Sequence, residues 1–380
     1  MKKVILIGAV SLSNKEDGVM QKFLSQAHAF DELGAQVDCI GYDRNSVVVS
    51  HYKNGRFQCE EIIAILKNIK SRRFSLWLGV RNYIKTQKYD LAYIRYPLID
   101  FIVLRTLRSV RKSCSKVVIE IPSYPLEIKN ITTIHKGLYI LDHVLHNNCA
   151  KLVDKILYVG SKVDSIFGCV AEQIPNGLPE QIKQIPSTGY RFEGNRIVLI
   201  CVSRMNFFHG YDRLLNGLAE HYKKKNDYVV DVVLVGDGFC RKEYERIVET
   251  NGLIEHVKFT GLLKGDALTD EYRNATIGIS TLGLYRKGFT EASSLKTKEY
   301  LVRGLPFVYA GNEIGLDDSF PYALKMPNDA SVISIDKIVD FANRIKVESA
   351  ELVKEKMKAY AEEKYSWKRI LQKACGEYLN

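Results

Sequence analysis

The chain of 380 residues has only nine prolines and no low-complexity run. This composition argues against long disordered tails. No stretch approaches the roughly 18 uncharged apolar residues that a membrane-spanning helix requires, so any membrane association is expected to be peripheral. A single hydrophobic core stops growing at roughly 250–300 residues, and this chain is longer. We therefore expect two domains, each with its own core.

The cysteines follow no pattern that would link them. There is no Cys-x-x-Cys pair and no cluster of histidines, so neither a zinc site nor a disulfide framework is indicated. The arrangement fits reduced cytoplasmic thiols that pack as small hydrophobic side chains. The eight cysteines are Cys39, Cys59, Cys114, Cys149, Cys169, Cys201, Cys240 and Cys375.

The first residues combine Lys2 and Lys3 with an apolar run at residues 4–10. A secretory signal has a similar start, but here charged residues follow at 15–17 and no small-residue cleavage pattern is present. A buried first strand explains the run better. We therefore expect a cytoplasmic protein.

Lysine and arginine outnumber aspartate and glutamate by 55 to 44, a formal net charge of +11. Residues 1–180 hold 25 basic and 17 acidic side chains, a net +8, which leaves +3 for residues 181–380. Residues 67–116 alone contain 13 basic residues and two acids, Asp90 and Asp100. The excess predicts an anionic partner such as a phosphate-bearing ligand, nucleic acid or a membrane surface. Two helices with solvated charged faces would explain the same segment.

Short apolar runs alternate with helix-length amphipathic stretches along the whole chain. This pattern is typical of βα units around a parallel sheet. A helix is expected over residues 19–33, where Val19, Phe23, Ala27 and Phe30 have helical spacing before the stop signal at Gly34. The expected strands are residues 4–7, 37–40, 91–96, 117–121, 156–159, 197–202, 229–235, 257–260, 277–280 and 306–310.

Prolines and glycines gather between the two halves, at residues 175–189, which is the best linker candidate. We expect an α/β fold of two Rossmann-like, doubly wound domains, residues 1–185 and 186–347, followed by a helical tail at 348–380 whose Trp367 lies on an apolar stripe. In such sheets ligands bind outside the carboxyl ends of the strands. A cleft between two such domains is then the default active site.

Two motifs in the second half fit an anion site. Val235-Gly236-Asp237-Gly238 ends a strand and precedes a helix. Glycines there would let backbone N–H groups approach a phosphate, although the third glycine of the dinucleotide fingerprint is missing and the motif alone is more often a tight turn. No Gly-Lys-Ser/Thr sequence occurs, which excludes a P-loop.

The second motif contains two carboxylates, Glu291 and Glu299, eight positions apart, and a helix is expected to start near Ser293. Backbone amides of Ser293, Ser294 and Leu295 would face an anionic group, and Glu299 could accept hydrogen bonds from a ribose diol. A capped amphipathic helix, with Ser293 as N-cap and both acids solvated, would give the same sequence.

Taken in order, these motifs resemble the retaining glycosyltransferases of family 4 (glycosyl transferases group 1), which have the GT-B fold. Each motif is weak alone, and their order over residues 175–367 makes the resemblance specific. The first half matches less distinctly, at Asp17-Gly18-Val19 and at residues 33–37. The matching segments are Pro175-Asn176-Gly177, Ser203-Arg204, His209-Gly210-Tyr211-Asp212-Arg213-Leu214, Val235-Gly236-Asp237-Gly238, Glu291-x7-Glu299 and Tyr365-Ser366-Trp367.

The resemblance implies transfer of a sugar, with retention, from a nucleotide-diphosphate sugar in the C-terminal domain to an acceptor in the N-terminal domain. It also implies that the last helix of the 348–380 tail crosses back to the N-terminal domain. A UDP-sugar donor, a lipid-linked glycan acceptor and a role in capsule, exopolysaccharide or O-antigen synthesis are expected. Arg204 matches the arginine that contacts the donor diphosphate, Glu299 the ribose-binding acid, and Glu291 the acid near the donor sugar. Gly18, Gly236 and Gly238 are the expected glycines of the donor site.

The chain departs from the family at His209, where five residues after the arginine a lysine is usual. A neighbouring diphosphate would favour the protonated imidazole. We hypothesise that Lys296 supplies part of the missing charge; a solvated lysine on a helix is the alternative. Metal dependence is not expected, because no two aspartates are separated by a single residue, and no cofactor is expected either.

Acceptor contacts are expected at two loop ends, from Arg95 and Tyr96 and from Glu120 and Tyr124. Aromatic residues interleave the basic segment 67–116, which suits docking on an anionic membrane that carries the acceptor. A nucleic-acid-binding protein is the main rival on charge, but no recognition motif accompanies the basic residues. A nucleotide-sugar epimerase of the same fold, or an inactive partner subunit, remains a further alternative.

Overall fold

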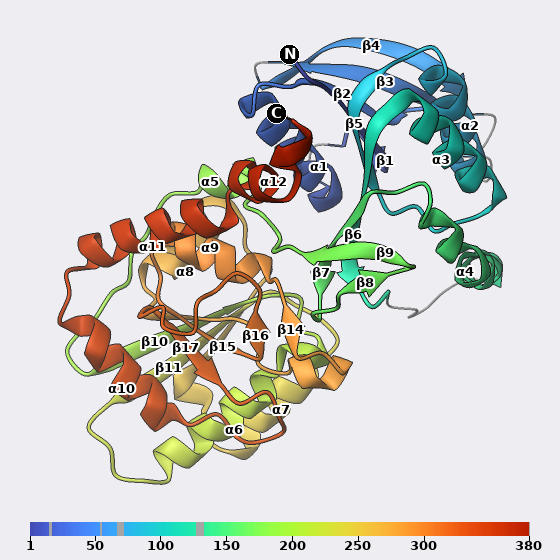
Figure 1. Ribbon diagram of the computed structural model, residues 1–380. Coiled ribbons are helices and arrows are strands. Elements are labelled where there is room, and N and C mark those ends of the chain that lie inside the picture. The colour runs from blue at the N-terminus through green and yellow to red at the C-terminus, as the bar shows by residue number, and fades with distance from the viewer. Residues whose placement is uncertain (15–16, 54, 67–71, 127–132, 380) are drawn as a thin grey trace. The chain divides into compact units, whose positions relative to one another are not determined.

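A computed structural model describes residues 1–14, 17–53, 55–66, 72–126 and 133–379. The chain divides into two compact units. The first contains Met1–Glu180 together with Ser366–Asn380, and the second is Gln181–Tyr365. Each unit is an α/β structure around a largely parallel sheet (Figure 1).

The first unit contains a nine-stranded sheet in the order β4-β3-β2-β1-β5-β6-β7-β9-β8. Its centre is parallel, and β3, β4 and β8 join antiparallel to their neighbours. The strands are β1 (Lys3–Ser11), β2 (Gln36–Asp43), β3 (Ser46–Lys53), β4 (Arg56–Ile65), β5 (Tyr89–Arg95), β6 (Cys114–Tyr124), β7 (Lys155–Gly160), β8 (Ser165–Ile166) and β9 (Cys169–Gln173).

Helices cover both faces of this sheet. The helices α1 (Gly18–Glu32) and α12 (Trp367–Cys375) pack together on one face, and α2 (Arg72–Ile84) and α3 (Phe101–Ser113) pack together on the other (Figure 1). One hydrophobic cluster joins the inner sides of α2 and α3 to the central strands through Trp77, Leu107 and Ile94. The helix α4 (Thr133–Leu145) follows β6.

The second unit has a six-stranded, fully parallel sheet in the order β12-β11-β10-β13-β15-β17, the strand order of a doubly wound fold. A two-stranded sheet, β14 (Glu291–Ala292) with β16 (Asn312–Glu313), stands beside it. The main strands are β10 (Arg196–Val202), β11 (Val229–Val235), β12 (Val257–Gly261), β13 (Ile277–Ile279), β15 (Phe307–Ala310) and β17 (Ala323–Met326). The helices are α5 (Glu180–Lys183), at the boundary between the units, α6 (Tyr211–Tyr222), α7 (Arg241–Thr250), α8 (Gly265–Arg273), α9 (Leu295–Arg303), α10 (Ile335–Lys346) and α11 (Ala350–Tyr365).

Every expected strand is present. The apolar run at the N-terminal end forms β1, in which Val4, Ile5, Leu6 and Ile7 are fully buried. The expectation missed the antiparallel extension of β3 and β4. The last helix of the expected tail, α12, lies in the first unit. The helix α11 packs on α9 and belongs to the second unit, so only the residues from Ser366 onward join the first. Within the described residues, no helix is both long and apolar enough to span a membrane.

The segment at residues 175–177 is fastened to α1 and α12. The Lys22 ammonium donates to the Asn176 side chain at 2.9 Å and lies 5.3 Å from the ring centre of Trp367. A side chain at Gly177 would place its Cβ 2.6 Å from the indole of Trp367. Both the Pro-Asn-Gly and the Tyr-Ser-Trp motifs therefore have a structural role within the first unit.

This packing predicts that Gly177→Ala destabilises the protein. The new methyl group must displace a fully buried indole, and overpacking of this kind costs about 1–3 kcal/mol. Thermal unfolding should show a clearly lower midpoint. Gly137→Ala is the control, because this exposed glycine within α4 has nothing within 4 Å of its added Cβ. An unchanged midpoint for Gly177→Ala would contradict the packing described.

Candidate functional site

The candidate site lies at the carboxyl ends of the strands in the second unit. The sheet order changes direction between β10 and β13, the first and fourth strands of the unit, which is the switch point where doubly wound sheets bind ligands. The loops that leave this edge are residues 203–210 after β10, 236–240 after β11 and 280–288 after β13.

The first two loops are joined by backbone hydrogen bonds. The Met205 N–H donates to the Asp237 carbonyl at 3.0 Å, and the Cys240 N–H donates to the Met205 carbonyl at 2.8 Å. A Cβ on Gly236 would lie 2.0 Å from the Ser203 carbonyl oxygen, and both Gly236 and Gly238 have positive φ angles, of 119° and 159°. The two glycines thus allow the loops to approach each other, which is the tight-turn role the motif alone suggests.

The loop after β13 is attached to the same segment. The Leu282 N–H donates to the His209 carbonyl at 2.8 Å, and Arg286 forms hydrogen bonds of 2.5 and 2.8 Å with the Asp212 carboxylate. The buried Arg213 guanidinium donates to the Leu282 carbonyl. Residues of the His-Gly-Tyr-Asp-Arg-Leu motif therefore hold the loops that leave β10 and β13 in place.

His209 and Lys296 meet at the Tyr211 side chain. The imidazole of His209 stacks on the Tyr211 ring with 5.6 Å between centroids, and the Lys296 ammonium lies 3.3 Å from the Tyr211 hydroxyl. Lys296 is the second residue of α9, whereas His209 ends the short 3₁₀ turn after β10. Among the described residues no carboxylate lies within ion-pair distance of Lys296.

Burial decides the charge of both groups. It lowers the pKa of His209 to about 3, helped by the positive charge of Lys296, so the imidazole is neutral at pH 7. Its Nδ1 accepts a hydrogen bond of 3.1 Å from the Asn206 N–H, which leaves the ring proton on Nε2. Burial also lowers the pKa of Lys296 to about 7. The imidazole therefore carries no charge of its own at pH 7, and the charge at this point of the site is on Lys296.

The start of α9 already holds a carboxylate. Glu313 accepts hydrogen bonds from the Ser294 N–H at 3.0 and 3.2 Å and from the Thr297 hydroxyl at 3.0 Å, and it pairs with the buried Lys298. The N-cap is Ser294 rather than Ser293, whose hydroxyl accepts a 2.7 Å hydrogen bond from Lys298. The motif around Glu291 and Glu299 gives no sign of this pair, because Glu313 comes from β16, beyond the motif.

The other expected donor residues occupy different places. Arg204 is exposed on the loop after β10, and its guanidinium has no ion-pair partner in the described part of the chain. Glu291 lies half-buried in β14, and Leu295 is the first residue of α9. Glu299 forms an ion pair of 2.8 Å with Arg303.

Gly18, in the first unit, opens α1, and an added Cβ there would meet nothing within 4 Å. Packing within the protein therefore does not explain why this position is a glycine.

The four expected acceptor residues lie in different environments, one in the interior and three nearer the surface. Glu120 is fully buried, 2.5 Å from the Lys22 ammonium, and it accepts a 2.8 Å hydrogen bond from Gln26. Although burial alone would raise its pKa, Lys22 holds the pKa of this carboxyl below its usual value. The expectation that Glu120 contacts an acceptor directly is therefore wrong.

Arg95, Tyr96 and Tyr124, the other three expected acceptor residues, lie nearer the surface. The Tyr96 hydroxyl donates to Asp142 at 2.6 Å and is already engaged. Arg95 and Tyr124, at the ends of β5 and β6, are partly exposed. Of the four expected acceptor residues, these two remain available to touch an acceptor.

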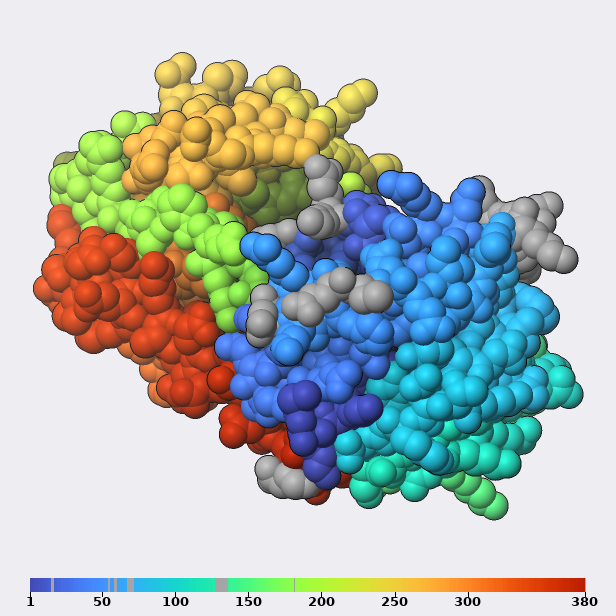
Figure 2. Space-filling view, turned by 90° about the horizontal axis from the view of Figure 1, so that it is seen from above, coloured from blue at the N-terminus to red at the C-terminus, as the bar shows by residue number. Residues whose placement is uncertain are grey.

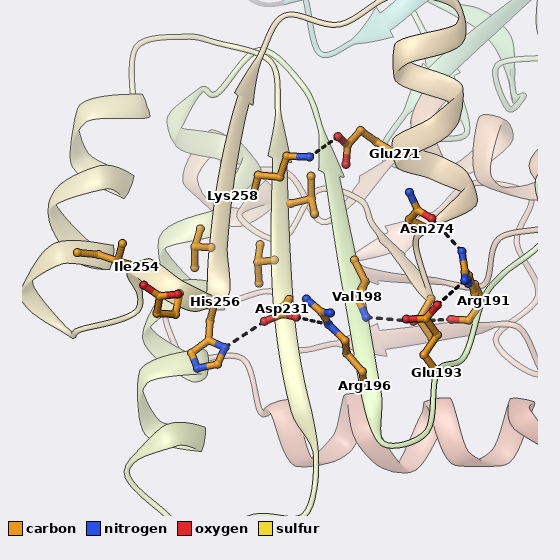
Figure 3. A pocket seen from close by; sticks show the side chains of 15 residues that line it. Arg191, Glu193, Arg196, Val198, Asp231, Ile254, His256, Lys258, Glu271 and Asn274 are labelled. Carbon is orange, nitrogen blue, oxygen red and sulfur yellow. Dashed lines mark hydrogen bonds and ion pairs between the residues drawn. The ribbon is translucent and has the colours of Figure 1, made fainter.

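A separate pocket of about 340 Å³ lies near the opposite, amino ends of β10, β11 and β12 (Figure 3). Its charged groups face one another. Asp231 bonds to Arg196 at 2.6 Å and to His256 at 3.0 Å, and Lys258 pairs with Glu271 at 2.5 Å. Because these groups neutralise each other, the pocket offers less to a charged ligand than the carboxyl edge does.

A comparison with protein families finds its match in the second half of the chain, which contains the candidate site. Residues 187–316 match the family model for glycosyl transferases group 1. This segment contains Arg204, His209, Glu291, Lys296 and Glu299. A search of curated proteins found no match.

Solved structures similar to the whole chain have the GT-B fold, so the expected fold class is confirmed. Sucrose-phosphate synthase from Thermosynechococcus elongatus has 14% identity and a TM-score of 0.58, with 100% of this chain and 98% of that chain covered. HepE from Anabaena, in complex with UDP, has 14% identity and a TM-score of 0.58, with 99% of each chain covered. The catalytic domain of starch synthase IV from Arabidopsis thaliana, bound to ADP and acarbose, has 10% identity and a TM-score of 0.63, with 100% and 99% covered. At these identities the similarity shows the fold alone.

The charge state of Lys296 gives a pH prediction for any anionic ligand of this site. Lys296 is cationic below its pKa of about 7 and loses its charge as the pH rises. We expect kcat/KM for a nucleotide-sugar donor to fall about tenfold per pH unit above that pKa, until the contribution of the ammonium is lost. Lys296→Arg should flatten this decline, because guanidinium stays charged.

The control is Lys242→Arg, on an exposed part of α7. It should leave the pH profile of the wild type unchanged. Lys296→Ala should lower kcat/KM at pH 6.5 by about 10- to 100-fold, the usual effect of losing a hydrogen bond to a charged group. A wild-type profile that stays flat to pH 9, or an unchanged kcat/KM in Lys296→Ala, would contradict a role for this side chain.

Proposed function

We propose that the protein is a metal-independent, retaining glycosyltransferase that moves a sugar from a nucleotide-diphosphate sugar to a glycan acceptor. The observation that carries the proposal is Lys296. Its ammonium lies at the switch point of the sheet, without a carboxylate partner among the described residues, inside the segment that matches the family model. A desolvated cation in this position is suited to a diphosphate.

The reaction requires charge stabilisation more than a strong base. The bond between the anomeric carbon and the diphosphate oxygen breaks, and the acceptor hydroxyl oxygen forms a new bond to that carbon on the same face. The proton of the hydroxyl passes to the departing phosphate oxygen. Lys296 and Arg204 would stabilise the negative charge that develops on the leaving group. Neutral His209 would contribute a hydrogen bond from Nε2 rather than a charge.

The remaining donor contacts follow from the positions of the side chains. Glu291, half-buried in β14, is proposed to bind hydroxyls of the donor sugar. Glu299 is proposed to accept hydrogen bonds from the ribose, with Arg303 fixing its carboxylate. Backbone groups of Ser293 and Leu295 and of the turn at Gly236 and Gly238 complete the proposed site, whereas the Ser294 N–H is taken by Glu313.

The nucleotide and the acceptor are finer proposals. UDP is the proposed nucleotide, because the similar structure of HepE is a complex with UDP. The proposed acceptor is a lipid-linked glycan in the biosynthesis of a surface polysaccharide, made at the cytoplasmic face of a membrane, with Arg95 and Tyr124 as its contacts. A nucleotide-sugar epimerase of the same fold is the second candidate, since it would use the same cations on the same diphosphate.

Release of nucleotide distinguishes the two candidates. Purified protein would be incubated with UDP-glucose, UDP-galactose or UDP-N-acetylglucosamine, each with and without a synthetic prenyl-diphosphate-linked N-acetylglucosamine. A transferase releases UDP only with the acceptor and yields a product of the same anomeric configuration as the donor. Release of UDP without acceptor, together with an epimerised sugar, would favour the epimerase.

The same assay tests independence from metal ions. We expect turnover to survive an excess of EDTA, because Lys296 and Arg204 are proposed to supply the positive charge that a divalent cation would otherwise provide. Loss of turnover in EDTA that Mg²⁺ or Mn²⁺ restores would contradict this part of the proposal.

A further inference from the structure

The helices α2 and α3 of the first unit enclose a strongly basic hollow. It has a volume of about 510 Å³ and is lined by side chains from both helices and from the turn after α2. No acidic residue is among its lining residues, which are Arg81, Lys85, Lys88, Arg105, Arg108, Ser109, Lys112 and Ser113. We call this group the α2–α3 groove. Part of the basic segment, residues 67–71, lies outside the described residues.

The cations of the groove have no carboxylate partner among the residues that the structure describes. Lys88 donates to the Lys112 carbonyl at 3.2 Å. Among the described residues, no carboxylate lies within 4.0 Å of the charged groups of the other five. The Nε of Arg81 is buried and has no hydrogen-bond partner in the described part of the chain. By contrast, Arg111 and Lys116 both pair with Asp154, outside the groove. The groove therefore combines close like charges with an unsatisfied donor, which an anion would relieve.

Each helix also carries an exposed aromatic residue at its start. Phe74 of α2 is 56% exposed and Phe101 of α3 is 62% exposed. Along α3, Phe101 is followed on the same face by Arg105, Arg108 and Lys112, at intervals of four, three and four residues.

A row of residues along α2 has the same spacing. It consists of Phe74, Leu78, Arg81 and Lys85, the last of which lies just beyond the end of the helix. Both helices lead into the amino ends of parallel strands, β5 and β6, so they run in the same direction. The two phenylalanines consequently lie near the amino ends of the two helices, and the cations of the groove follow towards the carboxyl ends. In Figure 2 the sky-blue to cyan segments that contain these helices form part of the exposed surface of the first unit.

We infer that the α2–α3 groove docks the protein on an anionic phospholipid membrane. The lipid phosphodiester groups would occupy the groove, and Phe74 and Phe101 would enter the boundary between headgroups and acyl chains. A bilayer offers this combination, a layer of phosphates next to an apolar layer. A nucleic-acid duplex offers the phosphates as well, but its bases are stacked inside, so it gives no such reason for two exposed phenylalanines on the same faces. The inference does not depend on the proposed transfer reaction, because it concerns where the protein binds.

Vesicle sedimentation of the full chain tests the inference. The vesicles contain phosphatidylcholine alone or 30% phosphatidylglycerol, at 50 mM and 500 mM NaCl. One variant carries Lys85→Gln, Arg105→Gln, Arg108→Gln and Lys112→Gln, four exposed positions of the groove. The matched control carries Lys223→Gln, Lys225→Gln, Lys242→Gln and Arg246→Gln, four exposed positions of the second unit. Both variants lose four positive charges, so a comparison between them separates the groove from net charge.

We expect the wild type and the control to bind the anionic vesicles in 50 mM NaCl, with at least a tenfold loss in 500 mM NaCl. The groove variant should bind at least tenfold more weakly than the control. Phe74→Ser with Phe101→Ser should weaken binding while keeping its dependence on salt. Equal binding to both kinds of vesicle, or equal losses in the groove variant and the control, would overturn the inference. A short DNA duplex that binds the wild type more tightly than anionic vesicles do, through the same four side chains, would also overturn it.

Discussion

The backbone at residues 203–205 lies so close to the turn after β11 that neither Gly236 nor Gly238 has room for a side chain. The rest of the candidate site depends on this contact. It fixes the start of the loop that carries Arg204 and ends at His209, and the loop after β13 is bonded to the same segment. Parallel strands that change direction at one point bring these loops to a single edge of the sheet.

Burial at this edge sets the chemistry that the site can perform. His209 loses its charge and keeps a hydrogen-bond donor, while Lys296 retains a charge that is only partly populated at pH 7. A protein cation without a counter-ion is costly to keep in place, and an anionic ligand removes that cost by supplying the partner. The site therefore favours a ligand that carries its own negative charge. Elsewhere at the same edge, Lys298 and Glu313 form a closed pair and leave no charge for a ligand.

Local patterns predicted the elements well. The apolar runs that form β1, β5, β6 and β11 were evident from the sequence, because a buried parallel strand is continuously apolar. The hairpin of β3 and β4 was missed, although Val47–Val49 of β3 form a short buried apolar run. Its partner β4 carries charged and exposed residues and shows no such run. The glycines at 236 and 238 were correctly placed in a tight turn, but only the structure shows the backbone atoms that each approaches.

The site was less predictable than the fold, because burial is not a local property. Nothing in the sequence near Glu120 indicates that it is fully buried against Lys22, from a helix 98 residues earlier. The pairing of Glu313 with the start of α9 was unpredictable for the same reason, because it joins side chains from two different elements, β16 and α9. For the basic segment, the sequence showed the excess charge, whereas the separation of paired cations such as Arg111 from unpaired ones such as Arg108 required the structure.

The central claim is that the carboxyl edge of the second unit binds a diphosphate. The most direct measurement is the thermal unfolding midpoint with UDP, ADP or GDP, each compared with its own nucleoside, because a ligand that binds only the folded protein raises the midpoint by mass action. The account predicts a higher midpoint with at least one nucleoside diphosphate and little change with the nucleoside. No shift with any nucleoside diphosphate, or an equal shift with the nucleoside alone, would contradict it.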